Sequence, residues 1–167
     1  LLLLGLLRPD AGEVVLNGRP LRCYPRRELA RQLAYVPQTH TVPFPYTVRD
    51  VVLLGRLPHT GLVHSPSPQD QAVVAKTLAR LGIESLADRP YSEVSGGERQ
   101  LTLIARALAQ GARILVLDEP ATGLDYGNQL RFLQHLRGLA AEGFADSYLY
   151  SSGRRRGSAT PASVSPA

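Results

Sequence analysis

The sequence predicts an α/β fold built on a parallel β-sheet, and three observations support this prediction. Ile114–Leu117 is a continuous apolar run, which suits a strand buried on both faces of a parallel sheet. Leu33–Val36 is a second short apolar strand, closed by Pro37. Apolar residues also recur at helical spacing at Leu101, Ile104, Ala105 and Leu108. We therefore expect both strands in one sheet that is flanked by helices.

A hairpin is expected near the start of the chain. Asn17-Gly18 separates Glu13–Leu16 from Arg19–Tyr24. An Asn-Gly pair favours the two positive φ angles of a type I′ turn, so the flanking segments should pair as antiparallel strands.

A helix is expected from Ser67 to about Leu81. Ser67 can cap the first turn, Pro68 suits the first helical position, and Asp70 places a negative charge near the positive end of the helix dipole. Gly82 supplies the stop signal.

The composition is that of an ordinary globular protein. The 167 residues are about one domain in length, with 44% hydrophobic and 20% charged residues. The single cysteine, Cys23, cannot form an internal disulfide, so nothing indicates an oxidising compartment. No apolar run approaches the ~20 residues that cross a bilayer, so we expect no membrane-spanning segment.

The segment 147–167 differs from the rest of the chain. It is rich in Ser, Gly, Ala, Pro and Arg and has no acidic residue. With so little apolar surface to offset the entropy of ordering, we expect it to be a disordered tail. Arg154–Arg156 contribute to the formal net charge of +5. A short basic run in a solvated tail is common, so we expect no nucleic-acid partner.

The segment Ser95–Gln100, which reads Ser-Gly-Gly-Glu-Arg-Gln, lies where a loop becomes a helix. Backbone N–H groups at a helix N-terminus are unpaired, Gly96 and Gly97 let an anion approach, and Ser95 adds a hydroxyl donor. The pattern therefore predicts a phosphate site. Ser followed three residues later by Glu98 is also a capping box, and these residues alone leave the two interpretations evenly balanced.

Two adjacent carboxylates, Asp118 and Glu119, follow the apolar run at 114–117. Open α/β sheets bind their ligands at the carboxyl ends of the strands. We expect Asp118 to hold Mg²⁺ through water, and Glu119 to orient or deprotonate an attacking water. The alternative is an acidic turn stopped by Pro120, but desolvated carboxylates without a partner would be costly there.

Four motifs together resemble the ATP-binding subunits of ABC transporters. Val94–Gln100 is similar to the ABC signature, and Ile114–Glu119 is similar to the Walker B strand with its catalytic glutamate. Thr122–Asp125 resembles the D-loop and Tyr35–Gln38 the Q-loop. Their order and spacing make chance a poor explanation. The resemblance extends over about 1–144, with valine at the first signature position where leucine is usual.

This resemblance implies a P-loop NTPase-like parallel sheet core in a partial ABC ATPase domain, 1–146, with an inserted helical subdomain at about 47–92. It implies ATP and Mg²⁺ as cofactors and a head-to-tail dimer with a second ATP-binding subunit. Asp118 and Gln38 would serve Mg²⁺ and water, and Glu119 would be catalytic. The residues implied at the nucleotide are Ser95, Gly96, Gly97, Glu98, Gln38 and Asp125.

A finer resemblance rests on Gly-Arg-x-Pro-His at Gly55–His59, a pattern similar to importers of iron-siderophore, haem and cobalamin. It implies a peripheral subunit on the cytoplasmic face of the cell membrane. Its partners would be a membrane permease and, indirectly, a substrate-binding protein. Coupling to the permease would pass through Gln38 and a loop through Tyr46 and Val51.

Two histidines, His59 and His64, lie close together in the sequence. They have no carboxylate or cysteine nearby, so we expect surface or loop residues there rather than a metal site.

Two motifs that members of the family carry are not found among the 167 residues. Family members carry a glycine-rich Walker A loop with a phosphate-binding lysine just before the segment that matches Leu1–Asp10. They also carry a histidine switch where this chain has Ala145–Tyr150. We therefore expect the 167 residues alone to bind ATP weakly and to hydrolyse it at no more than a trace rate.

Three functional interpretations follow. The first is a fragment of an importer's ATP-binding subunit. The alternative is a non-catalytic remnant that only supplies the signature loop to a partner's ATP site. The weakest interpretation is a soluble ABC ATPase of DNA repair or chromosome structure, because it would need a long heptad insertion that Pro58–Glu93 does not contain.

Overall fold

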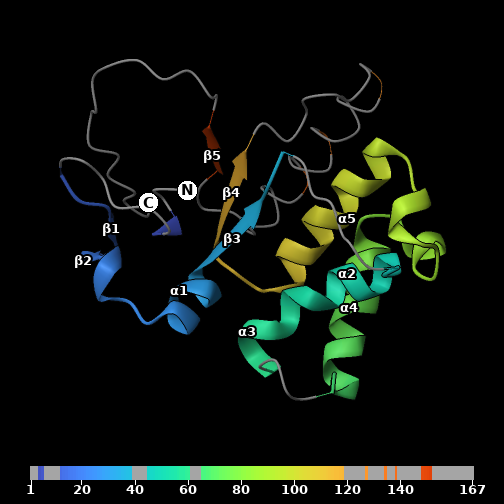
Figure 1. Cartoon of the computed structure of the whole chain (residues 1–167), viewed down its shortest axis with the longest axis horizontal. Coiled ribbons are helices and arrows are strands. Elements are labelled where there is room, and N and C mark those ends of the chain that lie inside the picture. Colours follow the sequence, from blue (N-terminus) through green and yellow to red (C-terminus); the bar gives the residue numbers. More distant parts are fainter. Residues whose placement is uncertain are drawn as a thin grey trace.

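The computed structural model describes residues 4–5, 12–38, 45–60, 65–118 and 148–151, together with the isolated positions 127, 134 and 138. Figure 1 shows a three-stranded sheet at the centre, with most helices on one side and a small hairpin and α1 on the other. The arrangement is α/β, as the sequence predicts.

The central sheet has the strand order β3-β4-β5. β3 (Leu33–Val36) pairs in parallel with β4 (Ile114–Asp118), and Val36 lies opposite Leu117. The prediction that both apolar runs belong to one parallel sheet is confirmed. The first four residues of β4 are buried, because a strand in the middle of a covered parallel sheet has no face toward water.

The third strand, β5 (Tyr148–Ser151), was not expected. It pairs in parallel with β4, with Asp118 opposite Ser151. The expectation of disorder from Ser147 onward is therefore wrong for these four residues. Backbone hydrogen bonds to the open edge of β4 order them whatever their side chains are. The rest of the tail lies outside the described residues.

The hairpin forms with the predicted turn. β1 (Val15–Leu16) pairs antiparallel with β2 (Arg19–Pro20), and the turn residues Asn17 and Gly18 have φ angles of 49° and 74°. The second strand is shorter than predicted, because the chain enters a 3-10 turn, η2 (Leu21–Cys23), directly after Pro20.

The helix α1 (Arg26–Gln32) follows the hairpin and was missed by the sequence analysis. Leu29 is its only buried residue, so its sequence carries almost no apolar periodicity.

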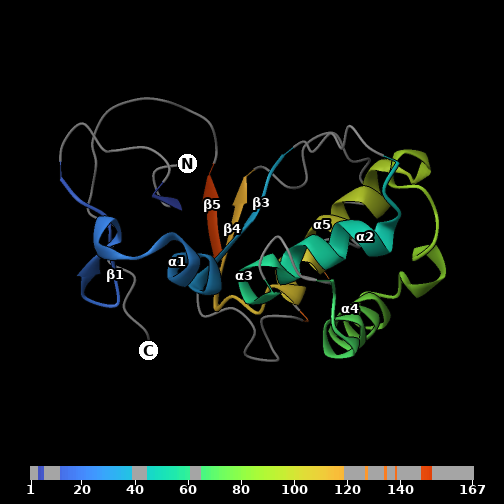
Figure 2. The same cartoon turned by 60° about the horizontal axis from the view of Figure 1, so that its bottom comes forward.

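Between β3 and β4 the described residues are mainly helical (Figure 2). Those of 47–92 agree with a helical insertion, whose boundaries as a subdomain stay a prediction. Among the described residues, we find no helix with the length and apolar character that a bilayer crossing requires. In chain order the elements are α2 (Val48–Leu53), η3 (Leu54–Arg56), α3 (Leu57–Thr60), α4 (Pro68–Arg80), η4 (Glu84–Leu86), η5 (Tyr91–Glu93) and α5 (Gly96–Ala109).

Three of these helices begin with a capping box, in which a Ser or Thr and the acid three residues later bond each other's backbone N–H. The predicted start at Ser67 and the stop at Gly82 are both confirmed, and Gly82 has a φ of +66°. The capping pairs are Thr47 with Asp50, Ser67 with Asp70, and Ser95 with Glu98.

Two hydrophobic cores meet at β4, because alternate residues of a strand face opposite sides of the sheet. Leu115 and Leu117 join a core built mainly from α2, α4 and α5. Ile114 and Val116 join a second core beneath the hairpin and α1. The helices that carry the candidate site are thus anchored to one face of the sheet.

The buried carboxylate of Asp70 leads to the first prediction. Asp70 Oδ2 accepts hydrogen bonds from Ser67, and Oδ1 accepts one of 2.8 Å from Arg56 Nε. These contacts, with that of the Ser67 side chain the largest cause, lower the pKa of Asp70 to about 2. Because the pKa of Asp70 is lower in the folded state than in the unfolded state, its ionised carboxylate stabilises the fold. This stabilisation is fully present above about pH 4 and is lost as the pH falls toward 2.

Replacing Asp70 with Asn is expected to lower the free energy of unfolding near pH 7 by about 2 kcal/mol, and by progressively less between pH 4 and 2. Urea denaturation at a series of pH values measures this. The control is Asp88→Asn, which removes an exposed ion pair with Arg49 and should cost under about 1 kcal/mol. An equal deficit for Asp70→Asn at pH 7 and pH 2.5 would contradict the assignment.

Candidate functional site

The carboxyl edge of the sheet brings together two of the residues predicted for Mg²⁺. Because β3 and β4 are parallel neighbours in register (Figure 1), Asp118 at the end of β4 and Gln38 just after β3 emerge at the same edge. The Tyr35 hydroxyl donates a hydrogen bond of 3.0 Å to Asp118 Oδ2. Burial, and then the contact with Asp118, raises the pKa of Tyr35, so the phenol remains a donor at neutral pH.

The surroundings of Asp118 fit a hydrated cation. Its side chain is half-buried, and within the described ranges no Lys, Arg or His forms an ion pair with it. The oxygen that Tyr35 does not contact remains for a water of Mg²⁺. The described residues also form no group of three or more His, Cys, Asp or Glu that could hold a metal ion. Asp118, with one oxygen held by Tyr35, could accept a hydrogen bond from a water of a Mg²⁺ bound at this edge.

The second candidate region is the N-terminus of α5. Ser95 Oγ accepts the backbone N–H of Glu98 at 3.4 Å, and Glu98 Oε2 accepts the backbone N–H of Ser95 at 2.7 Å. The Ser95 hydroxyl also hydrogen bonds the Glu98 carboxylate, so its one hydrogen would have to turn from Glu98 to donate to an anion, while its lone pairs keep the cap. The cap and the phosphate site, which the sequence left as alternatives, are compatible.

The two glycines present further donors at this helix end. Gly96 and Gly97 occupy the first two helical positions, where a backbone N–H has no acceptor within the helix. Ser95 and Gly96 are exposed, so a phosphate can approach them. Since the dipole of the 14-residue helix adds partial positive charge here, the arrangement suits an anion.

Neighbouring contacts hold this loop in place. Val94 is 2% exposed, so the valine that replaces the usual leucine still fills the core. Thr102 Oγ1 donates to Glu98 O at 2.7 Å, and Arg99 Nη2 donates to Ser92 O at 2.5 Å. The backbone hydrogen bond from Ser95 is the main cause that lowers the pKa of Glu98. Glu98 thus serves the cap, and its contact with a nucleotide stays a prediction.

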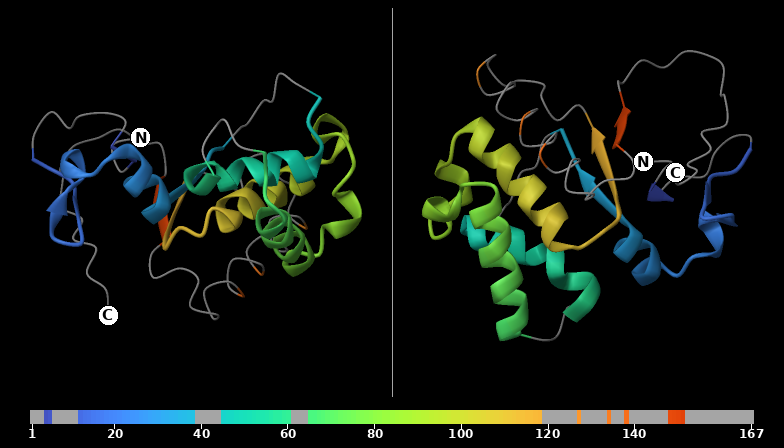
Figure 3. Two further views of the ribbon diagram at one scale, coloured as in Figure 1. Left: turned by 90° about the horizontal axis from the view of Figure 1, so that it is seen from below. Right: turned by 180° about the vertical axis from the view of Figure 1, so that it is seen from behind.

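The two regions do not form one site within this chain. α5 is about 21 Å long at 1.5 Å per residue. Figure 1 and the rear view in Figure 3 show its N-terminal end on the helical side of the molecule, away from the tip of β4. An anion bound at Ser95 would therefore not lie over Asp118 of the same chain.

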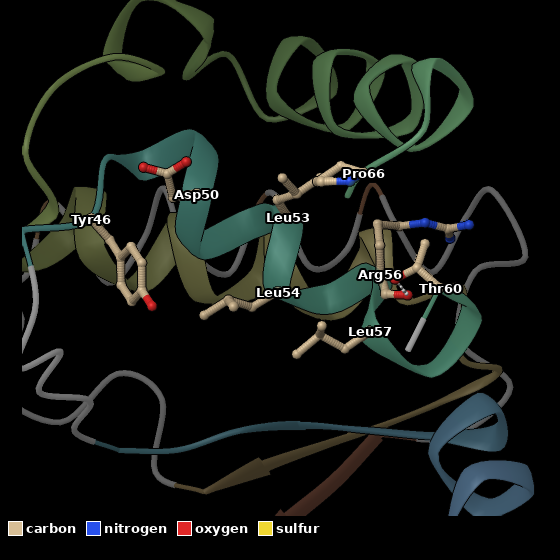
Figure 4. A pocket seen from close by; sticks show the side chains of 8 residues that line it. All are labelled: Tyr46, Asp50, Leu53, Leu54, Arg56, Leu57, Thr60 and Pro66. Atoms are coloured by element: carbon tan, nitrogen blue, oxygen red, sulfur yellow. Dashed lines mark hydrogen bonds between the residues drawn. The ribbon is translucent and has the colours of Figure 1, made fainter. Parts of the chain in front are cut away.

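A pocket of about 230 Å³ opens beside α2 and α3, and three leucines contribute to its lining. Figure 4 shows the side chains of Tyr46, Leu54 and Leu57 on the same side of the ribbon. Leu57 is 36% exposed, more than the other leucines whose side chains the structure describes. The lining residues are Tyr46, Asp50, Leu53, Leu54, Arg56, Leu57, Thr60 and Pro66.

The pocket corrects one expectation about coupling. Tyr46 lines the pocket, but Val51 is fully buried inside α2 and does not belong to a loop. Helix α2 turns Val51 into the core because Val48 and Val52 on the same face pack there too.

A sequence profile of the ABC transporter family matches residues 1–122. The chain belongs to the ABC transporter family. The profile match covers the Q-loop, the signature and the Walker B strand, so the family resemblance drawn from these motifs is confirmed.

Individual ABC proteins give the same result. An uncharacterized ABC transporter ATP-binding protein of Haemophilus influenzae is 44% identical over 143 residues, which are 86% of this chain and 54% of that protein. The hemin import ATP-binding protein of Pseudomonas entomophila is 43% identical over 148 residues, covering 86% of this chain and 56% of that protein. The chain spans about half the length of these curated relatives.

The fold has a matching solved structure. A metal-chelate type ABC transporter in an inward-facing conformation superimposes with a TM-score of 0.69 and 38% identity, over 72% of this chain and 48% of that one. The predicted P-loop NTPase-like fold is confirmed. Other relatives are named for cobalamin and iron(3+)-hydroxamate import, so the resemblance to this importer type is confirmed as well.

Not every ABC site residue predicted from the sequence can be placed. Glu119, Asp125 and His64 lie outside the described residues. His59 Nε2 is 2.7 Å from the carbonyl oxygen of Gln110, so this histidine has a protein partner. Lys76, the one lysine among the 167 residues, lies within α4, away from any glycine-rich loop.

The sequence analysis missed the role of Tyr35 beside the Walker B aspartate. Tyr35 lies opposite Val116 in the parallel register, and Asp118 is two residues further along the same face of β4. This signal becomes visible only once the pairing of the two strands is known.

Proposed function

We propose that the chain is part of the ATP-binding subunit of an importer for an iron-siderophore, haem or cobalamin-type substrate, and that it contributes to ATP sites shared with a second subunit. The observation that carries this proposal is the N-terminus of α5. There the backbone N–H groups of Gly96 and Gly97 occupy the first two helical positions, Gly96 is exposed, and Ser95 holds the cap through its hydrogen bonds with Glu98.

In this proposal the signature loop acts on ATP held by the partner subunit. The Ser95 hydroxyl and the N–H groups of Gly96 and Gly97 donate to γ-phosphate oxygens, whose charge the helix dipole favours. A partner is needed because the Asp118 edge of this chain lies apart from its own signature loop.

The sheet edge would serve the chain's own nucleotide. Asp118, oriented by Tyr35, would accept a hydrogen bond from a water of Mg²⁺, and Gln38 lies at the same edge. Bound Mg²⁺ would neutralise phosphate charge during transfer to water. Glu119 follows Asp118 in the sequence and is proposed to orient or deprotonate that water. Asp125 is proposed to contact the nucleotide across the dimer.

The pocket beside α2 and α3 is the proposed contact with a membrane permease. Tyr46, Leu54 and Leu57 offer an apolar surface that suits the apolar face of a short helix. In this proposal the subunit lies at the cytoplasmic face of the membrane, with a substrate-binding protein as an indirect partner. The names of the relatives that import hemin, cobalamin and iron-hydroxamate support the substrate class.

Nucleotide-dependent association tests the proposal. The partner is a full-length ATP-binding subunit of the family whose catalytic glutamate is replaced by Gln, so that ATP persists. Sedimentation of this partner with the 167-residue chain should show a mixed dimer with MgATP and separate subunits without it. Adding Ser95→Arg to the chain should abolish the dimer. Association that is independent of nucleotide, or of Ser95, would show that the loop is only a helix cap.

A further inference from the structure

The segment Gly55–His59 packs against the C-terminal end of α5. Gly55 is buried, and a Cβ at this position would overlap the carbonyl oxygen of Arg106 and lie 3.3 Å from the backbone nitrogen of Gln110. The backbones of η3 and α5 are therefore in direct contact, which only a glycine allows.

The side chain of Arg56 connects η3 with α4 and α5. Its Nε donates to Asp70 Oδ1 at 2.8 Å, and its Nη1 donates to the carbonyl oxygen of Ala109 at 2.7 Å. The side chains of Arg56 and Asp70 are 15% and 5% exposed. The carbonyl of Ala109 belongs to the last turn of α5, where intrahelical donors run out and a cation is favourable.

His59 makes a similar contact with the next carbonyl, that of Gln110, the C-cap residue of α5. Its Nε2 is 2.7 Å from the carbonyl oxygen of Gln110, which can only accept, so this ring nitrogen carries the hydrogen. The Gln110 side chain in turn donates to the carbonyl oxygens of Ala30 and Leu33, at the junction of α1 and β3. The end of α5 is thereby tied to the sheet.

The other side of the segment is held by α1. Arg27 donates to the carbonyl oxygens of Pro58 and His59, both at 3.0 Å, and Arg31 donates to that of Pro58 at 3.3 Å. The segment is thus clamped between α1 and the C-terminal end of α5. Arg56 and Leu57 also line the pocket in Figure 4, so a molecule in the pocket would contact the segment Gly55–His59, which we call the clamp.

We propose that Arg56 and His59 are positioning residues that set the direction of α5 and, through it, the position of the signature loop at the opposite end. This inference rests on the proposed function only in taking Ser95–Gly97 as phosphate donors. A tilt of about 5° at one end of a helix about 21 Å long displaces the other end by about 2 Å. Displacements of ~1 Å in a catalytic constellation can cost about a hundredfold in rate.

The test measures the direction of α5 directly, without nucleotide. Nitroxide labels on Arg22→Cys and Glu93→Cys, with Cys23→Ser, report the distance from η2, beside the hairpin, to η5, which leads into the first turn of α5. Both labelled positions are exposed. His59→Phe removes the donor to Gln110, whereas His59→Gln keeps an amide donor. Arg56→Lys keeps the charge but cannot reach both acceptors together. Arg49→Ala, which breaks an exposed ion pair on α2, is the control.

We expect His59→Phe and Arg56→Lys to broaden or shift the distribution of distances between the two labels by about 2 Å or more. His59→Gln and Arg49→Ala should give the same distribution as the unmodified chain. In mixed dimers His59→Phe and Arg56→Lys should also lower the ATPase rate about tenfold. Unchanged distances in folded His59→Phe and Arg56→Lys would overturn the inference, even if the melting temperature falls. If the distances respond but Ser95→Arg leaves the mixed-dimer rate unchanged, the proposed function fails and the clamp stands.

Discussion

Replacing Ser95 with arginine is expected to remove nearly all of the ATPase activity that this chain supports in a mixed dimer. Ser95 caps α5 and lies at its exposed N-terminal end. Arginine there removes the hydroxyl donor and fills the space beside Gly96 and Gly97 through which a phosphate would approach. Removing a single donor to a transition-state oxyanion typically costs about 10²–10³ in rate, and we expect at least that effect here.

The measurement uses an intact ATP-binding subunit whose own signature loop is disabled, so that its bound ATP depends on the loop of this chain. Steady-state phosphate release is compared without the chain, with it, and with the variant. Ser158→Arg, far along the sequence from the four motifs, is the matched control and should behave as the unmodified chain. Equal rates with and without the chain, once association is confirmed, would contradict the trans role.

Replacing Gly55 with alanine is expected to destabilise the fold strongly, because no other glycine compared among the described residues has backbone so close to an added Cβ. The added Cβ would overlap the carbonyl oxygen of Arg106, which is backbone and cannot move without displacing α5. Overpacking of a tight core costs about 1–3 kcal/mol, and contact with backbone should place this variant at about 3 kcal/mol or beyond.

The matched control for this change is Gly138→Ala. A Cβ at Gly138 would meet no atom within 4 Å, so this variant should unfold within about 1 kcal/mol of the unmodified chain. Urea denaturation followed by circular dichroism compares the two. If both variants unfold at the same urea concentration, the close approach of η3 to α5 is not a feature of the folded protein.

Local patterns determined several elements from the sequence alone. The helix start at Ser67, the Asn17-Gly18 turn and the buried run of β4 formed as predicted, and the capping box that was one of two interpretations at Ser95 is present. Each depends on hydrogen bonds within about four residues or on a continuous apolar stretch, so a short segment contains the whole signal. The prediction for Asp118 followed from the same logic, because ligands bind at the carboxyl ends of parallel strands, whereas that for Gln38 came from the resemblance to the Q-loop.

The sequence analysis was less successful where a segment's structure comes from distant partners. Helix α1 buries only Leu29, and β5 forms by pairing with β4, so neither has a strong local pattern. Val51 reads as part of a loop until α2 turns it into the core. In these cases tertiary packing outweighed the local sequence.

The sequence by itself determined the family motifs, their order and the helix cap that presents Ser95. Only the tertiary structure decided what the Gly-Arg-Leu-Pro-His segment contacts. His59 and Gln110 are 51 residues apart, and Tyr35 and Asp118 are 83 apart. A side chain can satisfy a carbonyl or orient a carboxylate only where the folded chain brings it within about 3 Å, and no local spacing contains that distance.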